Sequence, residues 1–260
     1  MSEPSSREAT TEAVSDPVSA FYERYHRPAE RGFDLSYVRD PLVYHLLEST
    51  IPAGGRCLDV GCGDGRAMAG LVRQMDLRYT GTDIATEAID RTRALGLAAE
   101  LMSSGRLPFA DASFDAVTWL EVIEHDFAPE ATMHEVLRVL RPGGVLCVST
   151  PNVAYWRRRL DVFLLGRWNP YGYSLAVSEP WGDPHIRFFT PRSLGGLMGK
   201  VGFERVRVHG TGGGLLLDVP GLGRTLRAQR HHASPPYRLL QRWAPSVFGC
   251  FLMGIGYRPA

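Results

Sequence analysis

Three glycines, separated by single residues, stand between an apolar run and an amphipathic stretch. Leu58-Asp59-Val60 leads into Gly61-Cys62-Gly63-Asp64-Gly65, and Arg66 follows. Glycine lets a backbone approach a ligand closely, and the N–H groups that open the next helix are unpaired. The segment can therefore hold a polar cofactor against the main chain. A plain tight turn would also use glycine, so the ligand has to be identified from other residues.

A carboxylate ends the next apolar run. Asp83 lies in Gly81-Thr82-Asp83-Ile84, 18 residues after Gly65. A carboxylate at the end of the second strand of a nucleotide-binding fold accepts hydrogen bonds from both ribose hydroxyls. The alternative role of Asp83 is to cap the next helix. Arg66 occupies the third-glycine position of the dinucleotide fingerprint, which argues against an NAD-dependent dehydrogenase.

Two further motifs follow in order: Leu107-Pro108-Phe109 with Ser113-Phe114-Asp115-Ala116-Val117, and then Leu140-Arg141-Pro142-Gly143-Gly144. Together with the glycine turn and the carboxylate they cover residues 56–150. In this order and at these distances, the sequence resembles the class I S-adenosylmethionine-dependent methyltransferases. The resemblance implies an α/β fold with a doubly wound, Rossmann-like, mostly parallel sheet of seven strands.

The resemblance also implies a cofactor site. The three glycines would line the methionine and ribose part of S-adenosylmethionine, Asp83 would hold the ribose, Ile84 would contact adenine, and Leu120 would face the methionine moiety. Met102-Ser103-Ser104 stands where the family often has Gly-Asp-Ala, so Ser103 would be a weaker, uncharged acceptor for the adenine amino group. The expected cofactor residues are Asp59, Gly61, Gly63, Gly65, Asp83, Ile84, Ser103 and Leu120.

Glu121-Val122-Ile123-Glu124-His125 directly follows the run Phe114–Leu120, which is expected to be the fourth strand. Methyl transfer to a hydroxyl needs in-line geometry and removal of a proton. An imidazole can take up a proton near neutral pH, so His125 is the candidate general base. The alternative is a structural histidine that bonds to neighbouring backbone.

The spacing E-x-x-E-H also resembles ubiquinone-pathway O-methyltransferases and small-RNA 2′-O-methyltransferases, in which carboxylates and histidine hold a divalent metal near the acceptor hydroxyl. The RNA enzymes add a downstream histidine, and His185 has a similar place in the chain order. The resemblance thus implies a possible metal site of Glu121, Glu124, His125 and His185. Carboxylate and imidazole ligands suit Mg, Mn, Fe or Zn.

Several elements must position these residues. Residues 1–15 are expected to be a disordered leader, and residues 16–260 a single methyltransferase domain. Within it, residues 16–50 form an N-terminal helical cap, 56–150 the cofactor-binding core, 152–190 an inserted substrate lid, and 191–260 the rest of the sheet with an insertion at 210–248. Short apolar runs alternating with amphipathic stretches predict the βα units of the core. Strands are expected at Arg56–Val60, Phe114–Leu120, Val145–Ser149 and near Phe251–Tyr257, and a helix is expected at Asn152–Leu165.

The expected lid is rich in aromatic residues, which would either wall an acceptor pocket or pack the lid on the core. They are Trp156, Trp168, Tyr171, Tyr173 and Trp181, with Tyr22, Tyr25 and His26 from the cap. The run Arg157–Arg159 is either a solvated face or a site for an anion or a lipid headgroup. Contact of residues 215–248 with a membrane surface is a further hypothesis.

Composition narrows the class of protein. A net charge of +1 over 260 residues argues against a nucleic-acid binder. Four scattered cysteines and a polar first segment without an apolar core predict a cytoplasmic protein. We expect a methyltransferase that methylates a small-molecule acceptor, most readily at oxygen. Methylation at nitrogen or carbon, and a non-catalytic cofactor-binding protein of the same fold, are the alternatives.

Overall fold

Seven strands form one sheet with the order β3-β2-β1-β4-β5-β7-β6. The pairs β1–β2, β2–β3, β1–β4 and β4–β5 are parallel, whereas β7 runs antiparallel to both β5 and β6. Our computed structural model describes residues 41–102, 106–166, 185–212 and 235–260. The mostly parallel, seven-stranded sheet expected from the sequence is confirmed.

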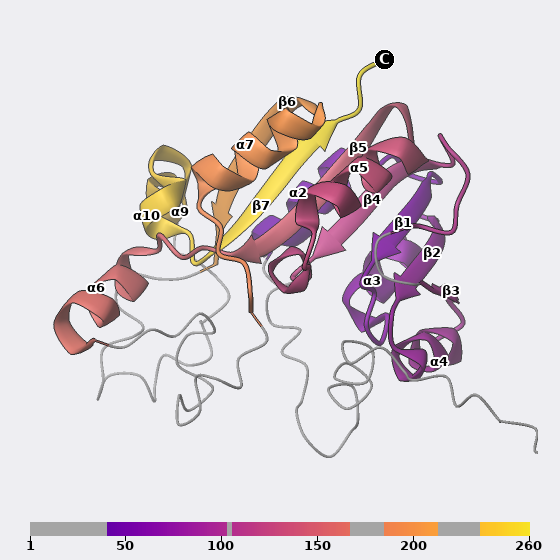
Figure 1. The fold of residues 1–260 in the computed structure, drawn as a ribbon, viewed down its shortest axis with the longest axis horizontal. Coiled ribbons are helices and arrows are strands. Elements are labelled where there is room, and N and C mark those ends of the chain that lie inside the picture. Colours follow the sequence, from indigo (N-terminus) through magenta and orange to yellow (C-terminus); the bar gives the residue numbers. More distant parts are fainter. Residues whose placement is uncertain (1–40, 103–105, 167–184, 213–234) are drawn as a thin grey trace, which may run out of the picture.

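Helices and strands alternate along the core as a doubly wound sheet requires (Figure 1). In chain order they are α2 (Pro41–Thr50), β1 (Arg56–Val60), α3 (Arg66–Gln74), β2 (Arg78–Asp83), α4 (Thr86–Ala94), β3 (Ala98–Leu101), β4 (Phe114–Leu120), the 3-10 turn η1 (Ile123–His125), α5 (Pro129–Val139), β5 (Leu140–Pro151), α6 (Trp156–Leu165), α7 (Pro191–Val201), β6 (Glu204–Thr211), α9 (Pro235–Trp243), α10 (Pro245–Phe248) and β7 (Phe251–Tyr257).

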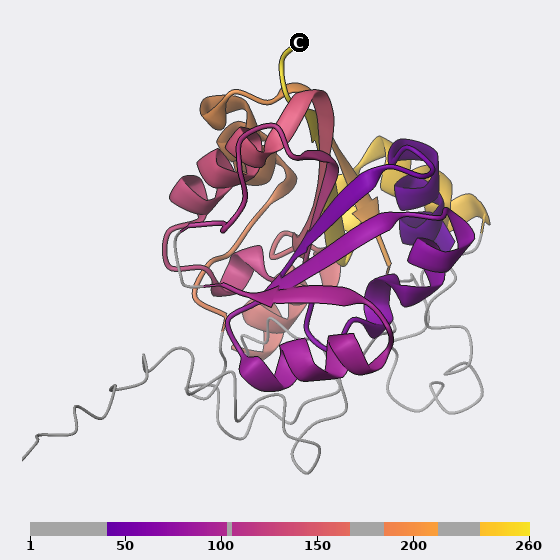
Figure 2. The ribbon, with the colours of Figure 1, turned by 90° about the vertical axis from the view of Figure 1, so that its right-hand side faces the viewer.

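Each face of the sheet has its own apolar core. Met133 of α5 and Met198 of α7 pack on one face, and Leu47 of α2 and Met68 of α3 pack on the other. Figure 2 shows α7 on one side of the sheet and the indigo and yellow helices opposite. Because both faces are covered, the central strands read as continuous apolar runs.

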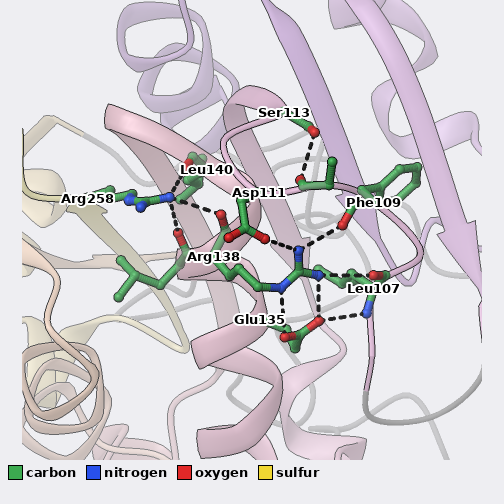
Figure 3. Close-up of polar contacts among 10 residues, drawn as sticks. Leu107, Phe109, Asp111, Ser113, Glu135, Arg138, Leu140 and Arg258 are labelled. Atoms are coloured by element: carbon green, nitrogen blue, oxygen red, sulfur yellow. Dashed lines mark hydrogen bonds and ion pairs between the residues drawn. The ribbon is translucent and has the colours of Figure 1, made fainter.

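The loop before β4 is clamped to α5 by Arg138 (Figure 3). Its guanidinium donates to the carbonyl oxygens of Leu107 and Phe109 at 3.1 and 2.8 Å, and it pairs with Asp111 and Glu135, each at 2.7 Å. Because the charged guanidinium bonds both to the loop and to Glu135 of α5, it holds the loop in a defined position on the helix. These bonds fix the path of the chain into β4. The residues expected to act on the acceptor follow the opposite end of this strand.

Two differences from the expected elements have physical causes. The strand expected at Val145–Ser149 begins earlier, at Leu140, because Leu140 pairs with Phe114 ahead of a register shift. Gly143 adopts a φ of +76° in that irregular stretch. The helix expected at Asn152–Leu165 starts later, at Trp156, because Asn152 bridges to Phe189.

Other expectations lie partly or wholly outside the described residues. These are the leader, the cap before Pro41, the lid between 167 and 184, and the insertion between 213 and 234. None of the helices in the described part is long and apolar enough to cross a membrane.

Candidate active site

The glycine turn after β1 is held open by its neighbours. Gly61 donates its N–H to the carbonyl oxygen of Thr82 at 2.8 Å, and Gly61, Gly63 and Gly65 have φ values of +72°, +54° and +74°. A Cβ on Gly61 would lie 2.6 Å from a methyl carbon of Val122. Only glycine therefore combines this backbone conformation with this close packing. The turn ends at α3, whose N-cap Gly65 offers no side chain, so a ligand can approach the helix N-terminus.

Asp83 joins this turn to the end of β2. Its two carboxylate oxygens accept the backbone N–H of Gly63 and of Ala85, each at 3.0 Å, and the residue is buried. A carboxylate oxygen has two lone pairs, so each can accept a further donor such as a ribose hydroxyl. Asp83 thus faces the turn and bonds the segment before α4, but it does not cap that helix, whose N-cap is Ala85 without a side-chain capping bond. Ile84, the next residue, is half-buried.

Asp59 lies beneath the turn, inside the sheet. Tyr79 and Thr118 donate their hydroxyl hydrogens to its two oxygens, both at 2.8 Å. Burial raises the pKa of Asp59 to about 6, although these hydroxyl bonds oppose the shift. This geometry gives Asp59 a supporting position under the cofactor residues. Leu120 is half-buried at the end of β4, and Ser103 lies outside the described residues.

Glu121 opens the segment after β4 in a strained conformation, with a φ of +55°. Ser149 at the end of β5 holds it from both sides: the serine Oγ accepts the Glu121 N–H at 3.0 Å, and its hydroxyl donates to the Glu121 carboxyl at 2.8 Å. Burial, followed by the nearby charge of Glu124, raises the pKa of Glu121 well above its ordinary value. No sequence motif singled out Ser149, although a polar residue near the end of a buried strand is a usable signal.

Glu124, His125 and His185 come together at the end of β4. Glu124 is 1% exposed, and its Oε1 lies 3.9 Å from His125 Nε2 and 3.6 Å from His185 Nε2. The two imidazole rings are stacked, and one ligand atom from each of the three residues lies within 4.8 Å of the others. The structure therefore unites three of the four residues expected to bind a metal. Glu121, the fourth, is outside this group and bonded to Ser149 instead.

The segment around His185 is strapped onto η1. Ile186 and Arg187 both donate their backbone N–H to the carbonyl oxygen of Glu124 at 3.0 Å, and the Arg187 guanidinium donates to the carbonyl oxygen of Phe127 at 2.7 Å. These bonds fix a distant part of the chain beside Glu124. The position of His185 thus depends on backbone contacts that no local sequence pattern encodes.

The three residues fit a divalent cation by their donor set. Two imidazole nitrogens and a carboxylate oxygen are ligands that Zn, Mn and Fe accept. The second carboxylate oxygen of Glu124 is buried and makes no hydrogen bond to any residue that the structure describes. A buried carboxylate oxygen without a donor is costly, and a cation would satisfy it.

The lid can be described only at its two ends. Trp156 contacts Tyr155 edge to face, with ring centroids 5.8 Å apart. Trp168, Tyr171, Tyr173 and Trp181 lie outside the described residues, as do Tyr22, Tyr25 and His26. An aromatic acceptor pocket therefore stays a prediction.

A family model described as a methyltransferase domain matches residues 33–208, more than half of the 260-residue chain. The chain belongs to this methyltransferase family. A probable S-adenosylmethionine-dependent methyltransferase of Mycolicibacterium smegmatis is 32% identical over 200 residues, 75% of this chain and 70% of the relative. A ubiquinone biosynthesis O-methyltransferase of Xanthomonas axonopodis pv. citri is 35% identical over 192 residues, 68% of this chain and 72% of the relative.

Other relatives align over less of their length: this chain spans 41% and 44% of two of them. Among solved structures, an S-adenosylmethionine-dependent methyltransferase of Thermotoga maritima, described as a possible histamine N-methyltransferase, superposes with a TM-score of 0.56 at 20% identity. That likeness covers 93% of this chain and 99% of the other, and it shows the fold. Membership of the S-adenosylmethionine-dependent methyltransferases confirms the enzyme class expected from the sequence.

Proposed function

We propose that this methyltransferase transfers the methyl group of S-adenosylmethionine to a hydroxyl group of a small-molecule acceptor. The observation that carries the proposal is the cluster of Glu124, His125 and His185 at the end of β4. The cluster follows directly on the segment that borders the glycine turn, because Val122, two residues before Glu124, packs against Gly61. A proton-accepting group beside the methyl donor is what a hydroxyl acceptor requires.

The proposed cofactor site consists mainly of the glycine turn after β1 and the carboxylate of Asp83. Gly61, Gly63 and Gly65 would leave their backbone open to the methionine and ribose, and the Asp83 carboxylate would accept the ribose hydroxyls. Ile84 and Leu120 would border adenine and methionine, and Ser103 would bind the adenine amino group. Asp59 would act from below by holding β1 and β2 in register through Tyr79. The bound cofactor supplies the electrophilic methyl group.

His125 would remove the proton of the acceptor hydroxyl. Of the two histidines it has the more accessible side chain, 15% exposed against 4% for His185. Buried Glu124 stabilises the imidazolium that forms when a histidine takes up a proton. The carboxyl of Glu121 is fixed by Ser149 and shapes the approach to the cluster.

The same three side chains could hold a divalent cation, which would supply a Lewis acid that acidifies the hydroxyl. In that case His125 and His185 act as neutral nitrogen ligands and Glu124 as the charged ligand. Glu121 would not contribute, because its carboxyl faces Ser149.

Methyl-labelled S-adenosylmethionine offered with a panel of phenols, catechols and matched anilines tests the proposal. We expect label on the hydroxyl compounds. His125→Ala should lower turnover by roughly 10²–10⁴ and leave S-adenosylhomocysteine affinity nearly unchanged. His134→Ala, an exposed histidine on α5, is the matched control. Label on the anilines alone would reject hydroxyl transfer.

A chelator separates the two versions of the mechanism. If His125 is a simple base, EDTA treatment followed by dialysis leaves wild-type activity intact. If the cluster binds a cation, EDTA abolishes activity and added Mn²⁺ or Zn²⁺ restores it. A His125→Ala enzyme that keeps near-full activity after EDTA would exclude both versions.

A further inference from the structure

Arg158 is a buried cation that the proposed function does not use. It stands in the first turn of α6, only 7% of its surface is exposed, and its Nη1 makes no hydrogen bond to any residue that the structure describes. Burial lowers its pKa, but an arginine guanidinium stays protonated in proteins. A buried charge is costly unless a partner offsets it. The structure thus contains a strong, unfilled donor.

The nearest carboxylates are otherwise engaged. Glu121 and Glu124 are close enough to act electrostatically on Arg158. Neither forms an ion pair with it in the described part of the chain, because Glu121 is held by Ser149 and Glu124 faces the two histidines. The guanidinium therefore lies near the proposed reaction centre, and no carboxylate among the described residues forms an ion pair with it.

The start of α6 adds a second reason to expect an anion. Helix N-termini favour negative charge, and arginine is unfavourable there. The first turn of α6 nevertheless contains Arg157, Arg158 and Arg159 and no acidic residue, and the N-cap Tyr155 makes no side-chain capping bond. The helix dipole and the Arg158 guanidinium thus both favour an anion near the start of α6, where the first turn of the helix itself supplies none.

We propose that Arg158, at the N-terminus of α6, binds a carboxylate or phosphate group of the acceptor. This inference rests on the proposed function, because it places the oxyanion next to the hydroxyl that Glu124, His125 and His185 would activate. A guanidinium binds a carboxylate or a phosphate through two parallel hydrogen bonds, so it would orient the acceptor as well as attract it. The acceptor would then be an acidic hydroxyl compound.

Direct binding tests the proposal without an activity assay. The full chain, saturated with S-adenosylhomocysteine, is titrated with benzoate, phenyl phosphate and neutral benzamide, and binding is followed by ligand-observed NMR. We expect one of the two anions to bind at least tenfold more tightly than benzamide. Benzoate and phenyl phosphate distinguish the two kinds of oxyanion.

Variants locate the effect. Arg158→Gln should abolish the preference for the anion, and Arg158→Lys should retain part of it. Arg159→Gln, an exposed arginine on the same turn, should leave it unchanged. Circular dichroism reports whether each variant folds, and the wild-type comparison of benzoate with benzamide needs no variant.

Two results would overturn the inference: equal binding of benzamide and both anions, or an anion preference that survives in Arg158→Gln. If that variant also loses S-adenosylhomocysteine binding, Arg158 acts at the cofactor instead. Failure of the proposed function would look different, because the anion preference would persist while no hydroxyl compound became labelled.

Discussion

The imidazole rings of His125 and His185 lie stacked, with centroids 4.7 Å apart and planes inclined by 18°, although one follows β4 and the other precedes α7. The two Nε2 atoms lie 3.9 and 3.6 Å from the same oxygen of Glu124. Neutral imidazole is the form that ligates metals, and a carboxylate near both Nε2 atoms can either stabilise a protonated ring or complete a cation site. The contact between the two histidines therefore depends on the backbone hydrogen bonds that hold the segment around His185 against η1.

His185→Ala tests this pairing. If the three residues form a cation site, the substitution should weaken binding of Mn²⁺ or Zn²⁺ by at least about tenfold, because a ligand is lost. Isothermal titration of the EDTA-treated protein measures this affinity. His134→Ala serves as the control. Equal metal affinity in wild type and His185→Ala would remove His185 from the site.

Asp83→Ala should weaken S-adenosylmethionine binding. A charge-assisted bond to the ribose is worth about 1.5–3 kcal/mol, or roughly 10- to 150-fold in affinity. Calorimetry measures the change, and Asp90→Ala on the exposed side of α4 is the control. Because Asp83 also accepts two backbone N–H groups, Asp83→Asn provides a milder variant. Unchanged affinity in both Asp83 variants would contradict the ribose assignment.

Gly61→Ala should destabilise the protein by more than the cost of placing alanine at a positive φ. Gly61 and Gly143 have similar φ values, +72° and +76°, but a Cβ would meet Val122 at the first position and nothing within 4 Å at the second. Gly143→Ala thus measures the cost of a positive φ, about 1 kcal/mol. Gly61→Ala should cost more and lower S-adenosylhomocysteine affinity as well. Equal destabilisation of the two variants in urea unfolding would show that Val122 moves aside easily.

The sequence predicted the sheet well where burial on both faces leaves a clear pattern. The strands at Arg56–Val60, Phe114–Leu120 and Phe251–Tyr257 have the expected bounds. The early start of β5 at Leu140 could not be predicted, because a pairing with Phe114 extends the strand through a Pro-Gly-Gly segment that locally reads as a turn. The short helices η1 and α10 carry too little periodicity to be detected.

The sequence predicted which residues could form the candidate site, but not which of them contact one another. The resemblance to metal-binding O-methyltransferases implied that Glu124, His125 and His185 meet, and the strap from Arg187 to Phe127 brings them together. The separation of Glu121 depends on its positive φ and on Ser149, a contact across two strands. Such long-range contacts have no local signature.

Asp59→Asn should change how stability depends on pH. Burial raises the pKa of Asp59 to about 6, from 3.8 for an ordinary aspartate, so between these values the folded chain keeps a proton that the unfolded chain has lost. Stability contributed by the protonated form is therefore present below about pH 4 and is lost as the pH rises through 6. Asparagine does not titrate. The unfolding free energy of the variant, relative to wild type, should rise by on the order of 2 kcal/mol between pH 4 and 7.5.

Urea denaturation followed by circular dichroism at both pH values measures this difference. Asparagine offers one oxygen where the carboxylate offered two, so either the Tyr79 or the Thr118 bond weakens and the variant starts from a lower stability. The lost hydrogen bond lowers the stability of the variant equally at both pH values. The effect of the buried charge is therefore read from how the stability difference between variant and wild type changes with pH. Asp90→Asn is the exposed control. A difference that stays constant across the range would show that Asp59 is ionised throughout, stabilised by its two hydroxyl donors against the cost of burial.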